Sequence, residues 1–121
     1  MALLQNQVRN LLVSQVQAVL ATVSPGPQYA PHLALMAYGF CPTLTQVYLA
    51  THGQARKAQH MLAPPGLVRI LWDNRTGNLR DHQHGMLVTA SGRASRPEDE
   101  HESKRLFLER NPNMGVLLFP T

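Results

Sequence analysis

The feature that most constrains this chain is a series of short apolar runs separated by turns. Three strand-like segments follow one another, at residues 18–23, 29–38 and 46–51. The first gap contains Ser24-Pro25-Gly26-Pro27, and the second is a turn at residues 40–43. Parallel strands need a connection of about a dozen residues or more, so connections this short favour antiparallel pairing. The three segments are therefore expected to form an antiparallel meander.

Further strands and helices are predicted on both sides of this meander. Strands are expected at 67–73 and 86–94, and helices at 3–17, 53–62 and 96–110. Ser95 and Glu98 form a capping box at the start of the last helix. A final apolar run, Met114–Phe119, is not assigned to a helix or a strand. The pattern indicates a mainly β fold, a small antiparallel barrel with flanking helices.

Length and composition support one domain. With 121 residues, 44% of them apolar, the chain can bury one core, and we expect a single domain over residues 1–121. The single cysteine, Cys41, excludes an internal disulfide and leaves no cysteine pair for a structural zinc site. No apolar run approaches the roughly 18 residues of a membrane span. Residues 1–7 lack the charged start of a signal peptide. We therefore expect a cytoplasmic protein without a membrane partner.

Charge is distributed unevenly along the chain. Residues 1–93 contain seven basic and two acidic residues, a balance of +5, and the remainder carries −1 of the total of +4. A region so poor in carboxylates favours an anionic ligand such as a phosphate or a nucleic acid. Ordinary solubilising charge explains the same excess, so the charge alone leaves both interpretations open.

The segment from Tyr48 to Leu62 is the strongest candidate for a binding site. A strand ends at Thr51, a short loop follows, and Arg56 and Lys57 fall in the first turn of the predicted helix. Free backbone N–H groups at a helix start attract anions. Arginine can hold two phosphate oxygens at once, and lysine adds a point charge. These features predict a phosphate site; the simpler alternative is an exposed basic pair on a solvated helix face.

Five short motifs follow one another along the chain in a recognisable order. The most specific is the string Leu-Ala-Thr-His-Gly-Gln-Ala-Arg-Lys-Ala-Gln-His-Met-Leu at residues 49–62. The others are Ala18–Val23, Pro31–Ala37, Leu67–Asp73 and Gly92-Arg93. Each motif is weak alone, but together they resemble the pyridoxamine 5′-phosphate oxidase-like family, the FMN-binding split β-barrels. The resemblance runs from about residue 18 to residue 94, continues loosely through the following helix, and implies a split β-barrel.

This resemblance implies a homodimer with FMN at the subunit interface. Arg56 and Lys57 would hold the FMN phosphate, with Ala50 and Thr51 near its ribityl-phosphate end and His52 beside the ligand. The flavin ring would lie along the second strand, on residues His32, Leu33, Ala34, Leu35, Met36 and Ala37. The flavin itself would transfer hydride or electrons, and the protein would hold and tune it. The implied function is an FMN-binding oxidoreductase acting on a small-molecule substrate.

The chain departs from the oxidases that name this family. Those enzymes carry an arginine early in the second strand and a lysine five residues later, where this chain has His32 and Ala37. A glutamine on their fifth strand falls near Leu87 here. Their C-terminal segment, which bears an arginine and a tryptophan, has no counterpart before Thr121. The sequence also ends about where these enzymes begin a sixth strand, so two alternatives stay open: this strand is missing, or the barrel is completed in another way. We therefore do not expect pyridoxamine phosphate itself to be the substrate.

Three alternatives remain beside FMN. The same fold accommodates deazaflavin F420 or haem. His82 and His84 lie on one side of a segment predicted to be extended, which suits a metal or a haem iron, although a solvated loop explains them more simply. A non-enzymatic basic barrel that binds nucleic acid is the third alternative, and the low aromatic content of 6% argues against it. Cys41 is expected to be a small turn residue rather than a nucleophile.

Overall fold

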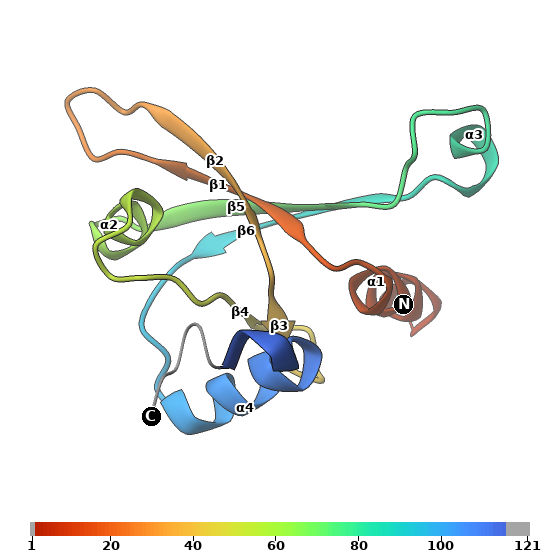
Figure 1. The fold of residues 1–121 in the computed structure, drawn as a ribbon. Helices are drawn as coiled ribbons and strands as arrows, with labels where there is room; N and C mark the ends of the chain where they lie inside the picture. Colours follow the sequence, from red (N-terminus) through yellow and green to blue (C-terminus); the bar gives the residue numbers. More distant parts are fainter. Residues whose placement is uncertain (1, 116–121) are drawn as a thin grey trace.

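The computed structural model describes residues 2–115 of the chain (Figure 1). Its elements are α1 (Ala2–Ser14), β1 (Ala18–Val23), β2 (Pro31–Met36), β3 (Gly39–Phe40), β4 (Val47–Tyr48), α2 (Arg56–Leu62), β5 (Leu67–Asp73), α3 (Asp81–His84), β6 (Leu87–Arg93), α4 (Glu100–Arg110) and the 3-10 turn η1 (Pro112–Met114). Residues 116–119 of the predicted last apolar run lie outside the described residues. Among residues 2–115, no helix is long and apolar enough to cross a membrane.

A four-stranded antiparallel sheet in the order β2-β1-β5-β6 forms the centre of the fold. β1 pairs with β2 over its full length and with the middle of β5, and β5 pairs with β6 over its full length. β3 and β4 form a separate two-stranded sheet. The fold is therefore mainly antiparallel sheet with flanking helices, and the predicted fold class is confirmed.

The inner face of the sheet carries the hydrophobic core. Side chains alternate between the two faces of a strand, so every second residue of β1 and β5 points inward. The buried cluster consists of Leu11, Leu12, Ala18, Leu20, Met36, Tyr38, Ile70 and Trp72. Tyr38 has no exposed surface, and its ring meets the edge of Trp72 at a centroid distance of 5.8 Å. Its hydroxyl donates to the carbonyl oxygens of Leu12 and Gln15, which ties the end of α1 to the core.

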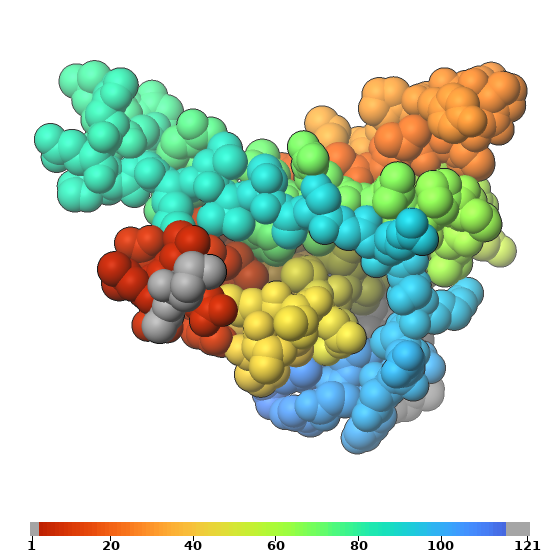
Figure 2. All heavy atoms as spheres, turned by 180° about the vertical axis from the view of Figure 1, so that it is seen from behind, coloured from red at the N-terminus to blue at the C-terminus, as the bar shows by residue number. Residues whose placement is uncertain are grey.

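The outer face of the sheet exposes several large apolar side chains. Leu33 and Leu35 of β2 are 68% and 65% exposed, and Leu67 of β5 is 58% exposed. In the strand register Leu35 lies beside Val19 and Leu71, whereas Leu33 lies beside Ala21 and Arg69. Figure 2 shows the β1–β2 end (orange) and the β5–β6 end (teal) standing on either side of a hollow that follows β5 and β6. This face has no covering element within the part of the chain that the structure describes.

The predicted meander is wrong in its third strand. Its first two strands pair as expected, but β4 pairs with β3, and the other neighbour of β1 is β5. After Met36 the chain leaves the main sheet, and β3 packs on α4. The two backbones approach closely at Gly39, where a Cβ atom would lie 2.8 Å from the Cα atom of Phe107, so a glycine suits this position.

The last helix also begins later than predicted. It starts at Glu100, and its N-cap is Asp99, whose carboxylate accepts a hydrogen bond of 3.0 Å from the backbone N–H of Glu102. The expected capping box of Ser95 and Glu98 does not form. Aspartate is as good an N-cap as serine, and Asp99 directly precedes Glu100, so Asp99 caps the helix in place of Ser95.

Candidate functional site

Most of the predicted cofactor residues gather around one cavity of about 490 Å³, within the size range of small-molecule sites. We call it the β2–α4 cavity, because it lies between the end of β2 and the end of α4. Its lining contains seven residues predicted from the sequence: Leu35, Met36, Ala37, Ala50, Thr51, His52 and Lys57. It also contains Val16, Gln17, Arg110, Asn111, Pro112, Asn113 and Met114.

Local structure explains why the predicted residues meet. β2 ends at Met36, so the backbone bends there and brings Ala37 toward the segment that follows β4. A turn closed by the hydrogen bond from the N–H of Ala55 to the carbonyl of His52 leads into α2. That turn aligns Lys57 of the first helical turn with the same cavity.

Four of the predicted residues lie outside this lining. Arg56 is exposed, and Leu33 lies on the outer face of the sheet. His32 and Ala34 belong to the inner face, where the ring of His32 meets the edge of His60 at 5.8 Å. The cavity lies at the end of β2, so Leu35, Met36 and Ala37 line it and the earlier residues of the stretch do not.

The electrostatics of the β2–α4 cavity favour an anion. Among the described residues, Lys57 and Arg110 are the cations of the lining and His52 is its imidazole, and none of these residues carries a carboxylate. Apolar side chains, among them Leu35 and Met36, supply the rest of the wall. The cavity can therefore hold an apolar group that carries negative charge.

Arg110 is the charged residue of the cavity that sequence reasoning missed. Its Nε atom donates to the Tyr38 carbonyl at 3.2 Å, and Nη2 donates to the Gln15 carbonyl at 2.8 Å. Its guanidinium stacks 4.6 Å from the Tyr38 ring centre and 5.3 Å from that of Phe40. A basic residue in the last turn of a helix is ordinarily explained by the helix dipole, so the sequence contains no local signal of this role.

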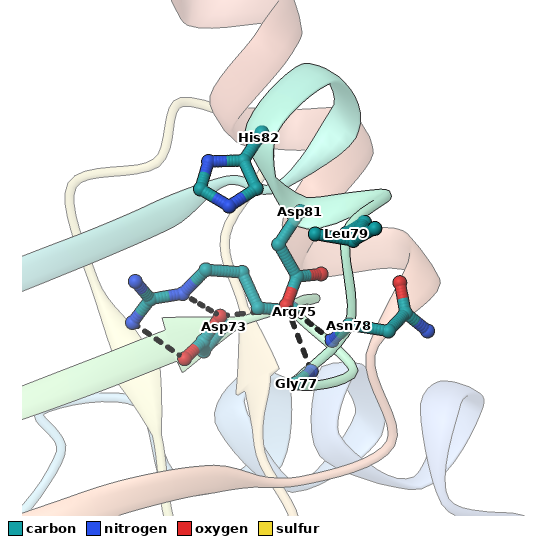
Figure 3. Close-up of a pocket in the computed structure, with 7 residues that line it drawn as sticks. All are labelled: Asp73, Arg75, Gly77, Asn78, Leu79, Asp81 and His82. Carbon is teal, nitrogen blue, oxygen red and sulfur yellow. Dashed lines mark hydrogen bonds and ion pairs between the residues drawn. The ribbon is translucent and has the colours of Figure 1, made fainter.

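A larger and more open hollow of about 740 Å³ lies in the β5–β6 loop (Figure 3). Its carboxylates are already engaged: Asp73 pairs with Arg75, and Asp81 accepts from the N–H groups of Thr76, Gly77 and Asn78. The hydrogen bond from the Arg75 side chain holds the pKa of Asp73 below its usual value. Hydrogen bonds from backbone N–H groups, that of Thr76 above all, lower the pKa of Asp81. These carboxylates therefore stabilise the loop itself.

His82 and His84 do not lie on one side of this loop, and both are exposed, as the simpler interpretation of a solvated loop expects. His82 and His84 belong to α3, a single helical turn, whereas an extended segment was predicted. Residues two apart on a helix do not face each other, so the two imidazoles do not point to one side. Within residues 2–115, no group of three or more His, Cys, Asp or Glu residues could hold a metal ion.

Cys41 lies in the β3–β4 turn and is more acidic than its position in the sequence indicates. Burial raises the pKa of the thiol, but hydrogen bonds from the hydroxyls of Thr43 and Thr45 and from the backbone N–H groups of Thr45 and Gln46 lower it to about 6. The corresponding distances to Sγ are 3.2 to 3.3 Å. The expectation of a turn residue is confirmed, and the thiolate is stabilised there.

Comparison with known proteins identifies the fold. No family model matches the chain, and no curated protein matches it. The conserved hypothetical protein Rv2991 from Mycobacterium tuberculosis has a similar structure, with a TM-score of 0.71, 20% identity and coverage of 95% of this chain and 74% of that one. At this identity the likeness shows the fold alone. The split-barrel-like fold implied by the sequence is therefore confirmed.

Two haem proteins have the same fold. The haem-binding protein from Mycobacterium smegmatis matches with a TM-score of 0.77 and 18% identity, over 95% of this chain and 46% of that one. HutZ, the haem storage protein from Vibrio cholerae, matches with a TM-score of 0.68 and 16% identity, over 95% of this chain and 78% of that one.

Proposed function

We propose that this chain binds haem in the β2–α4 cavity. The observation that carries the proposal is the lining, in which residues 2–115 contribute apolar walls, one imidazole, two cations and no carboxylate. Haem is a flat, largely apolar ring whose iron takes an imidazole ligand and whose edge carries two carboxylates. Each of these parts has a chemical counterpart in the cavity.

The residues fit haem as follows. His52 is the histidine that the described part of the chain contributes to the lining, and it is exposed, so its imidazole is available as an iron ligand. Lys57 and Arg110 are the partners for the carboxylates. Leu35 and Met36 supply apolar surface for the ring. Bound haem would supply redox and oxygen chemistry, and these residues would hold and orient it.

The fold comparisons support this choice of cofactor over FMN. Two of the solved structures that match are described as haem-binding or haem-storage proteins. In addition, the Arg56–Lys57 pair expected to clamp the FMN phosphate is divided: Lys57 lines the cavity, and Arg56 does not. A phosphate would meet one member of that pair rather than two.

FMN binding by an oxidoreductase with a small-molecule substrate is the second candidate. One observation favours it: Ala50, Thr51 and Lys57 line the same cavity as Leu35 to Ala37, as the resemblance implies for the two ends of the flavin. Deazaflavin F420 would use the same contacts. The three cofactors have different absorption spectra, so one titration separates them.

We further propose that the protein is a homodimer formed through the outer face of the sheet. Leu33, Leu35 and Leu67 are large apolar side chains exposed on this face, and monomeric proteins rarely leave large apolar patches in water. A second copy is the natural occupant, because Leu35 belongs both to this face and to the cavity wall. Dimerisation would then bring the partner close to the bound cofactor.

The cofactor proposal is tested by titrating the purified protein with haemin, FMN and F420. We expect a saturable Soret band with haemin and weaker or no uptake of the flavins. The variant His52→Ala should shift the Soret band and weaken binding, whereas His82→Ala, which alters an exposed histidine of α3, should not. Saturable FMN uptake without haem binding would instead establish the second candidate.

The dimer proposal is tested by light scattering after size exclusion. Leu33→Asp places a charge on the outer face but outside the cavity lining, and it should convert the dimer to a monomer. Leu79→Asp is the matched control, because Leu79 is 83% exposed in the β5–β6 loop. A wild-type mass of 13.4 kDa, that of one chain, would contradict the proposal.

A further inference from the structure

Among the described residues, Arg110 of the cavity has no carboxylate partner. Arg110 is half-buried at the end of α4. Within residues 2–115, the ion pairs involve Arg75 and Arg105, and no carboxylate lies within ion-pair distance of Arg110. The adjacent carboxylate, Glu109, is bound by Arg105. Charged groups withdrawn from water are usually paired, because an unpaired charge there is costly.

The guanidinium of Arg110 is nevertheless held firmly in place. It uses two of the five N–H donors of an arginine on the carbonyls of Tyr38 and Gln15, so three donors remain. Two aromatic rings, Tyr38 and Phe40, pack against it. A cation fixed before the ligand arrives loses less conformational freedom on binding than a mobile surface lysine does.

The remaining donors can serve a ligand because Arg110 lines the β2–α4 cavity. Lys57 lines the same cavity from α2, an element that stands apart from α4 in Figure 1. The two cations thus reach one cavity from different elements. Arginine also has the planar, forked geometry that suits a carboxylate.

We infer that Arg110 is a preformed carboxylate-binding residue, and that with Lys57 it selects a ligand with two anionic groups. This inference rests on the proposed function and specifies it: the β2–α4 cavity would recognise the carboxylates of haem and not only its ring. A neutral porphyrin of the same shape should therefore bind more weakly.

The test compares haem with its dimethyl ester, in which both carboxylates are neutralised. The wild-type protein should bind haem more tightly than the ester. Arg110→Gln should reduce haem affinity roughly 10- to 100-fold, the usual range for a lost charge-assisted hydrogen bond, and leave ester affinity unchanged. Arg110→Lys, which restores the charge without the fork, should recover part of the loss.

Arg105→Gln is the matched control, because it removes a cation from the same helix outside the cavity. It should leave both affinities as they are. The ester distinguishes a contact to the carboxylates from a purely structural role of Arg110. If Arg110 only supported the fold, Arg110→Gln would lower the affinities for haem and for the ester equally, and that result would overturn the inference. Equal wild-type affinity for the two ligands would also overturn it while leaving haem binding intact. Failure of the wild-type protein to bind haem would refute the proposed function itself.

Discussion

Removal of one buried hydroxyl, in the variant Tyr38→Phe, tests how the end of α1 is held to the core. The Tyr38 hydroxyl donates to the Leu12 carbonyl at 2.5 Å and to the Gln15 carbonyl at 3.0 Å. Both carbonyls lie where α1 ends, and the last carbonyls of a helix have no partner within it. The phenol therefore acts as a cap that comes from a distant part of the chain.

The expected loss of stability depends on which hydrogen bonds each carbonyl keeps in the variant. The Gln15 carbonyl retains a hydrogen bond of 2.8 Å from Arg110, so its share of the loss is small. The Leu12 carbonyl loses its partner in a buried place, which costs about 1–3 kcal/mol. We therefore expect Tyr38→Phe to lower the free energy of unfolding by about 2 kcal/mol, roughly a 30-fold change in the folding equilibrium.

Urea denaturation followed by circular dichroism measures this loss. Tyr48→Phe is the control, since the Tyr48 hydroxyl donates to the exposed Gln46 side chain and should change stability by less than about 0.5 kcal/mol. If the two variants were equally stable, the proposed capping by Tyr38 would be refuted. An unchanged dependence on urea concentration would show that the native and unfolded states remain comparable.

The same residue predicts a pH effect. Burial raises the pKa of Tyr38, although Arg110 and then Trp72 partly oppose it. The folded state therefore keeps this proton more tightly than the unfolded state. Its contribution to stability is complete below about pH 10, the ordinary tyrosine pKa, and is lost as the pH rises through the raised value. Tyr38→Phe should be less sensitive to alkali over that window.

Three further predictions concern other parts of the fold. Because the pKa of Cys41 is lowered to about 6, the rate of its alkylation by iodoacetamide should level off above about pH 7. Mass spectrometry measures this rate as a function of pH, and a midpoint near pH 8.5, the ordinary cysteine pKa, would contradict the prediction. Gly39→Ala places a Cβ 2.8 Å from the Phe107 backbone and should destabilise the protein by about 1–3 kcal/mol in thermal melts, whereas a neutral effect would mean that β3 and α4 separate easily. Asp99→Ala removes the cap on Glu102 and should cost about 1 kcal/mol, with Asp99→Asn keeping most of it; equal losses in both would show that the cap is not formed in solution.

Only part of the cavity lining could be predicted from the sequence, because its residues come from segments that are far apart along the chain. The string around Thr51 and Lys57 is continuous in the chain, so its resemblance to known proteins identified one wall of the cavity. The stretch from His32 to Ala37 is continuous in sequence, but only its last three residues line the cavity, because the cavity lies at the end of β2. Arg56 and Lys57 are adjacent in sequence, yet helical rotation directs only Lys57 to the cavity lining.

The sequence by itself determined the elements whose signals are local. Apolar alternation and flanking turns placed β1 at Ala18–Val23 and β5 at Leu67–Asp73 as predicted, and proline chemistry ended α2 at Leu62. The mainly antiparallel fold class follows from connections too short for crossovers. All of these depend on interactions between residues near one another along the chain.

Only the tertiary structure decided which elements meet. It paired β1 with β5, moved β3 and β4 into their own sheet, and brought Arg110 to a cavity whose other cation is Lys57. Strand order and cavity composition depend on close packing between segments more than fifty residues apart, such as Gly39 against Phe107. A local pattern records which face of an element is apolar, but not what that face is packed against.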